Sequence, residues 1–173
     1  MFTTDAEVEQ KLSAIKELAK EMTKYGQTAQ QTMQLANTAA QSGARGAELI
    51  AATKEATRLA VLGQMEQSQA IETTISLQTA FALSNKELAE SINFLNSVEN
   101  QTILSLQDVS EAIPRVASVI NGFGGDVKDL SVLLVAMKEG GVSAAEGANA
   151  LKNSMARIIS PTKNALETSA KYG

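Results

Sequence analysis

The chain has 173 residues, of which 44% are hydrophobic, 20% are charged and only 3% are aromatic, and its net charge is −4. This length and balance suit one globular domain with a sizeable core, built from closely packed helices rather than a sheet. The chain contains neither His nor Cys, which excludes disulfides, Ser-His-Asp and Cys-His catalysis and the usual zinc sites. A mild negative charge without a basic cluster argues against direct nucleic-acid binding.

Membrane insertion by this segment is not expected. The longest apolar run, residues 132–137, is six residues long, far short of the roughly 20 that a membrane-spanning helix needs. The N-terminal residues lack the apolar core of a signal peptide.

The first half of the chain predicts four helical segments. Thr4 with Glu7 begins the first, which ends at Gly26. The next three follow over about 28–41, 47–62 and 66–83. Residues 1–43 are interpreted as an N-terminal helical hairpin.

The second half shows four starts in which a capping residue is followed three residues later by an acid. They are Ser84 with Glu87, Ser105 with Asp108, Asp126 with Asp129, and Ser143 with Glu146. No side-chain signature repeats with them, which favours a bundle over a solenoid. The helix after Asp126 is apolar nearly all round, since it carries Val132 and Val135 beside its main stripe, and it is predicted to be the buried centre.

The expected fold is therefore all-α: a compact bundle of about eight short antiparallel helices with no sheet. No run of alternating β-branched and aromatic residues between turn residues predicts a strand. Residues 44–173 are interpreted as one core domain.

Three glycines mark the stretch from residue 138 to 162. Gly140 and Gly141 can adopt the left-handed conformation that ends a helix, because they have no Cβ. Gly147 lies in the first turns of the next helix, where glycine costs about 1 kcal/mol relative to alanine. Close approach of a neighbouring helix is the predicted reason for its presence.

The helix that contains Gly147 has both ends marked. Ser143 and Glu146 form the capping box at its start, and Leu151 belongs to its apolar face. Arg157 suits the negative end of the helix dipole, although a partner-binding role is an alternative. Pro161 forces the preceding residue out of the helical region. These residues are interpreted as a structural motif.

Other candidates favour structural readings. Carboxylates such as Glu87, Glu90, Asp108 and Asp129 lie near helix starts, where they stabilise exposed amides rather than serve as acids or bases. The segment NGFGGD (121–126) follows no strand and precedes no Lys-Ser/Thr, so a turn is favoured over a phosphate loop.

Two further features stay open at this point. The methionines fill the core or, less favoured, form an adaptable groove for a partner helix. Pro114 either kinks its helix or opens a new turn.

Several segments, taken in order, carry a resemblance to phage tail tape measure proteins. They are GAELIAATKEATRLA (46–60), SNKELAESINFL (84–95), SLQDVSEAIPRVASVINGFGGDVKDLSVLLVAM (105–137) and MKEGGVSAAEGANALKNSMARIISPTKNAL (137–166). The turn Gly140-Gly141-Val142 departs from the family's usual Gly-Ile or Gly-Val, and Ser and Thr near Leu77 replace expected alanines. These departures leave the phage type open.

The resemblance implies a non-enzymatic virion protein of the phage tail, made in the host cytoplasm. Such proteins set tail length and scaffold assembly of the tail tube. The implied partners are the tail tube protein, tail assembly chaperones and tail tip proteins, with self-association a further expectation and no cofactor. Because compact helices supply little length, the chain is interpreted as one module of a longer protein.

Two alternatives belong to other classes. A generic helical protein-interaction domain, of an adaptor or secretion-associated kind, has the same short capped helices. An enzyme would need Ser/Lys or paired-carboxylate chemistry, which no segment assembles.

Overall fold

The computed structural model describes residues 5–172, apart from the side chains of residues 5–8 and 11, and it confirms the all-α class. The described residues form nine α-helices and one short 3-10 helix, against about eight expected, and no strand. The expected cap at Thr4 lies outside the described residues. The helices are α1 (Asp5–Met22), η1 (Thr23–Tyr25), α2 (Ala29–Gln41), α3 (Gly46–Leu62), α4 (Gln67–Ala80), α5 (Asn85–Gln101), α6 (Leu106–Gly122), α7 (Val127–Glu139), α8 (Ala144–Ile159) and α9 (Lys163–Tyr172).

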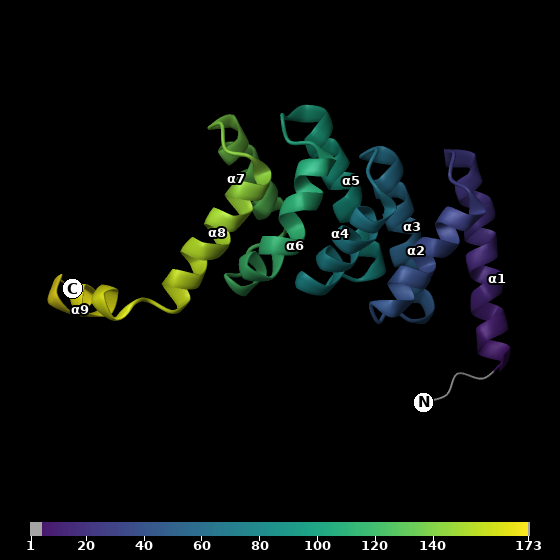
Figure 1. The fold of residues 1–173 in the computed structure, drawn as a ribbon, viewed down its shortest axis with the longest axis horizontal. Coiled ribbons are helices and arrows are strands. Elements are labelled where there is room, and N and C mark those ends of the chain that lie inside the picture. The colour runs from purple at the N-terminus through teal and green to yellow at the C-terminus, as the bar shows by residue number, and fades with distance from the viewer. Residues whose placement is uncertain (1–4, 173) are drawn as a thin grey trace.

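The helices form a bundle of antiparallel pairs drawn out along one axis (Figure 1). From α1 to α8, each helix contacts the next in sequence and also the next but one. The even-numbered helices therefore make one row and the odd-numbered helices a second. Four hairpins, α1–α2, α3–α4, α5–α6 and α7–α8, follow one another in chain order from one end to the other (Figure 1).

Two apolar clusters make up the core. The larger spans α3 to α8 and is centred on α6, whereas the smaller joins α2, α3 and α4 through residues such as Leu35, Ala52 and Ile71. Helices α3 and α4 contribute to both clusters. The predicted domain boundary near residue 43 crosses the smaller cluster, because Leu35 and Ala44 on its two sides belong to that cluster. The division of the chain into two parts stays a prediction.

Side-chain caps begin most of the helices. The four capping boxes predicted from Ser84 onward are all present, each with both reciprocal hydrogen bonds. A fifth, between Thr28 and Gln31, begins α2. These contacts lie within three residues of one another in sequence, which is why the sequence predicts them.

The expected central position of α7 is wrong. Helix α7 belongs to the last hairpin and contacts α5, α6 and α8, and its Val132 is 66% exposed. The centre is α6, which contacts α4, α5, α7 and α8. An apolar helix surface indicates that neighbouring helices can pack against it, but the tertiary arrangement decides how much of that surface they cover.

Pro114 lies inside α6 without ending it, on the exposed side. Proline has no amide hydrogen, so position 114 cannot donate to the carbonyl of Ser110 four residues earlier. The hydroxyl of the fully buried Thr73 in α4 donates to that carbonyl oxygen at 3.3 Å. The Ser110 hydroxyl also accepts from Gln69 of α4 at 2.7 Å. Pro114 therefore leaves an acceptor that α4 uses.

Replacing Thr73 with valine tests this contact. Thr73→Val should leave the Ser110 carbonyl buried and unsatisfied, lowering the free energy of unfolding by about 1–3 kcal/mol in urea denaturation. In a Pro114→Ala background, the restored amide can donate to Ser110 instead, so the same substitution should cost less. Equal losses in both backgrounds would contradict the role assigned to Pro114.

Candidate functional site

The turn between α7 and α8 holds the predicted glycine motif. Gly140 caps α7 with an ordinary φ of −77°, and Gly141 has the left-handed φ of +85°. The amide of Gly141 donates to the Lys138 carbonyl at 3.0 Å, and that of Val142 donates to the Met137 carbonyl at 2.9 Å. Of the two glycines that could end the helix, Gly141 adopts the conformation that favours glycine.

The capping box of α8 follows directly. The Ser143 hydroxyl donates to the Glu146 carboxylate at 2.7 Å, and the Glu146 amide donates to Ser143 Oγ at 3.3 Å. The carboxylate is thus engaged by the helix start, which is a structural role.

Gly147 faces α7 closely. A Cβ added at this buried position would lie 2.7 Å from Met137 Sδ and 3.5 Å from Met137 Cβ. A methyl group at this position would therefore have to displace the half-buried Met137 side chain, and no backbone atom of α7 is among the nearest atoms.

The remaining motif residues lie farther along α8. Leu151 is half-buried against the larger core cluster, whereas Arg157 and Pro161 are exposed. Helix α8 ends at Ile159, and α9 begins after Pro161 with no buried residue. The structure gathers the first five motif residues at the turn and leaves the last three spread along the molecule.

Lys138, which the sequence did not single out, connects the last hairpin to the centre. Its Nζ contacts the carboxylate of Asp108, the third residue of α6, which also accepts from Ser105 at 2.6 Å. Burial raises the pKa of Asp108, but the hydrogen bonds from Lys138 and Ser105 outweigh it and hold the pKa below its ordinary value. Thirty residues separate the pair, so no local sequence signal predicts it.

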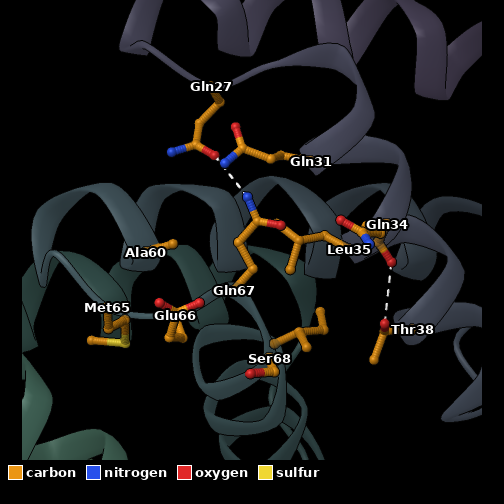
Figure 2. A pocket seen from close by; sticks show the side chains of 11 residues that line it. Gln27, Gln31, Gln34, Leu35, Thr38, Ala60, Met65, Glu66, Gln67 and Ser68 are labelled. Carbon is orange, nitrogen blue, oxygen red and sulfur yellow. Dashed lines mark hydrogen bonds between the residues drawn. The ribbon is translucent and has the colours of Figure 1, made fainter.

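A polar groove of about 510 Å³ lies between α2 and α4 (Figure 2). Buried Leu35 and Ile71 are part of its lining, beside four glutamine side chains. The side-chain amide of Gln67, the first residue of α4, donates to the side-chain oxygen of Gln27 at 3.1 Å, which joins α4 to the turn before α2. The four glutamines are Gln27, Gln31, Gln34 and Gln67. Their uncharged amides can form hydrogen bonds but cannot transfer protons at neutral pH.

A second hollow, of about 480 Å³, lies between α1 and α3. Beside it, burial raises the pKa of Glu55, although Arg58 donates to its carboxylate at 2.6 Å. Arg58 also donates to the side chain of Asn93 in α5 at 2.5 Å. This charged group therefore joins two helices of the odd-numbered row.

Three of the four carboxylates considered for acid–base roles cap helix starts, and the fourth, Glu90, pairs with a lysine. Glu87, Asp108 and Asp129 complete capping boxes, and Glu90 lies 3.7 Å from Lys86. The hydrogen bond from Ser84 lowers the pKa of Glu87. The NGFGGD segment includes the turn before α7, with Asp126 as the cap.

The described residues hold neither a candidate metal site nor a helix that could span a membrane. No group of three or more His, Cys, Asp or Glu side chains among them could hold a metal ion. None of the described helices combines the length and the apolar character needed to cross a membrane.

Comparison with known families identifies the chain. Residues 13–173 match the family of phage-related minor tail proteins. The chain belongs to this family. No curated protein and no solved structure matches it. Membership of the minor tail protein family indicates a structural role in the phage tail and association with the virion.

The pair of Asp108 and Lys138 predicts a pH dependence. A depressed pKa in the folded state stabilises the fold above the ordinary pKa of aspartate, near 4, and this stabilisation is lost as the pH falls through the folded value. Asp108→Asn should therefore lower the melting temperature at pH 7, and its difference from the wild type should shrink below about pH 4. Asp129→Asn is the matched control and should lower it less, because Asp129 caps α7 but forms no ion pair among the described residues. Equal shifts for both variants would contradict the role of Lys138.

Gly147 provides a second test. Gly147→Ala should lower the melting temperature, because displacing Met137 outweighs a gain in helix propensity of about 1 kcal/mol. In a Met137→Ala background the same substitution should raise it, since only the propensity gain remains. A rise in both backgrounds would contradict close packing as the reason for this glycine.

Proposed function

We propose that the chain is a structural and assembly module of a phage or prophage tail tape measure protein, involved in setting tail length and in scaffolding assembly of the tail tube. The observation that carries this proposal is the family match over residues 13–173. A resemblance to tape measure proteins, in chain order, favours that assignment within the minor tail protein family. It covers residues 46–60, 84–95 and 105–166.

The geometry supports a structural role in which the helices bind other proteins. The acidic residues three positions after the caps of α5 to α8 complete capping boxes. Most buried hydroxyls donate to carbonyl oxygens of their own helices, and that of Thr73 joins α4 to α6. Such groups stabilise an arrangement of helices rather than a reacting substrate. In this proposal the module is not an enzyme, and it contacts the tail tube protein, a tail assembly chaperone and tail tip proteins.

In this proposal the extended segment that measures tail length, the ruler, is not formed by these packed helices. An extended helix rises about 1.5 Å per residue, whereas packed helices add only about 8–10 Å each across the bundle. Residues 5–172 would span about 250 Å as one helix, and the antiparallel hairpins give up most of that length (Figure 1). The proposed module therefore belongs to a longer protein whose ruler segment lies outside it.

Deleting residues 5–172 in frame, in the phage or prophage that encodes the chain, tests the proposal. We expect few assembled tails, or tails of irregular length, in electron micrographs, and peptides of the chain in wild-type virions by mass spectrometry. Regular tails shortened by about 250 Å would mean that these residues act as an extended ruler rather than a folded module. Normal, infectious tails would overturn the assembly role.

Two point variants test whether tail assembly requires the folded structure of these residues or only their presence in the protein. Leu134→Asp buries an unpaired carboxylate and should reproduce the deletion, because Leu134 is 1% exposed. Ala136→Asp, at an exposed position of the same helix, should assemble normal tails. Equal phenotypes for the two variants would contradict a requirement for the fold.

A further inference from the structure

The polar groove between α2 and α4 lies over the junction of the two core clusters. Ala60 and Met65 in its lining belong to the larger cluster, and Leu35 and Ile71 belong to the smaller one. Because core packing holds all four side chains, the floor of the groove is apolar and fixed in position. Its volume of about 510 Å³ is within the range of sites that hold a ligand.

Polar side chains at helical spacing form one wall of the groove. Gln27, in the turn before α2, is followed by Gln31, Gln34 and Thr38, which recur every three or four residues and therefore share one face. This wall is about 16 Å long at the helical rise of about 1.5 Å per residue. An extended chain rises about 3.3 Å per residue, so about five of its residues match the length of the wall.

Several amide groups of the groove have hydrogen-bonding capacity to spare. The side-chain oxygen of Gln27 accepts from Gln67, and that of Gln31 accepts from Thr28. The amide nitrogens of Gln27 and Gln31 donate to no described residue, and the side chain of Gln34 bonds to none. In Figure 2 the side chains of Gln27, Gln31 and Gln67 point toward one another. The groove thus offers free donors and free acceptors close together.

Charge narrows the class of ligand. Glu66 is the ionised side chain among the described residues that line the groove, and it forms no ion pair with any described residue. A carboxylate without a counter-ion disfavours phosphate groups, and hence nucleic acids and acidic lipids, but attracts a cation. The described lining also contains no aromatic ring on which a nucleobase would stack.

The free amide groups favour an extended polypeptide over a helical one. A helix bonds most of its backbone N–H and C=O groups internally, so a helical partner has few left for the glutamines. An extended segment has both groups free at each residue, and its alternate side chains point to the same side. Its C=O groups can accept from Gln27 and Gln31, its N–H groups can donate to Gln34, and its alternate side chains can contact the apolar floor.

We propose that this groove binds an extended polypeptide segment of about five residues. The segment has small apolar side chains at alternate positions, which face Leu35 and Ile71, and one Lys or Arg, which faces Glu66. Its backbone bonds to the glutamine side chains. The site rests on the chemistry of the groove alone and does not depend on the tape measure assignment.

Blocked pentapeptides of the form acetyl-X-Thr-X-Lys-X-amide, in which X is alanine, valine or leucine, test the site. Added to the ¹⁵N-labelled 173-residue chain, they should shift the side-chain amide resonances of Gln27, Gln31 and Gln34 until the site is saturated. Isothermal titration calorimetry then gives the Kd of the tightest peptide. Replacing its lysine with glutamate, or methylating its backbone nitrogens, should weaken binding by about five-fold or more.

Two variants of α2 separate the groove from the rest of the helix surface. Gln34→Ala removes a free amide of the groove and should weaken binding by about five-fold. Gln30→Ala changes an exposed glutamine of the same helix outside the groove, so this matched control should bind like the wild type. Circular dichroism should be unchanged for both, because both positions are exposed.

Glu66→Gln tests the charge. It should weaken binding of the tightest peptide but should not weaken binding of the same peptide with glutamine in place of its lysine. If none of the peptides shifts the glutamine resonances, or if Gln34→Ala and Gln30→Ala bind the tightest peptide with equal affinity, the proposal is overturned. Either result concerns peptide binding only and leaves the role in tail assembly as it stands.

Discussion

The buried face of α6 is the constraint on which most of the fold depends. Leu106, Val109, Ile113, Val116 and Ile120 recur along this face, and all are buried in the larger core cluster. Ala112 and Ala117 lie among them, and small side chains let neighbouring helices approach closely. Because α6 contacts α4, α5, α7 and α8, its position sets the positions of both rows in the C-terminal two-thirds of the molecule.

Polar contacts fix where this apolar face lies. Besides its own capping box, the start of α6 receives Glu99 from α5, whose carboxylate accepts from the Leu106 amide at 2.9 Å. Lys138 from α7 contacts Asp108 two residues later, and the Thr73 hydroxyl of α4 donates to the Ser110 carbonyl. Apolar burial supplies most of the stabilisation but little direction. These hydrogen bonds select the register in which α6 meets its neighbours.

The hairpins of this bundle differ in how many neighbouring hairpins cover them. Among the described residues, the middle hairpins have neighbouring hairpins on both sides, whereas the first and last hairpins each have one neighbouring hairpin. In the proposed assembly role, contacts with other tail components would use the kind of packing surface that holds the hairpins together. The exposed apolar side chains of the first and last hairpins and the polar groove between α2 and α4 are the surfaces on which such contacts would differ in chemistry.

The sequence by itself determined what depends on neighbouring residues. The all-α class, the caps at Ser84, Ser105, Asp126 and Ser143, and the glycine that ends α7 were predicted correctly, because each rests on contacts within a few residues. Within the candidate motif, Gly141 alone of the two adjacent glycines is left-handed, Ser143 and Glu146 cap α8, and Met137 is the residue nearest to Gly147, which the sequence could not identify.

Only the tertiary structure decided which helices meet. The exposure of Val132, the contact between Lys138 and Asp108 and the bond between Thr73 and Ser110 join or separate elements far apart in the chain. An apolar stripe specifies that a helix face will be buried, but many partners can bury it almost equally well, since the hydrophobic effect is not directional. The choice among partners depends on the packing of the whole chain, and for that reason it cannot be inferred from any one segment.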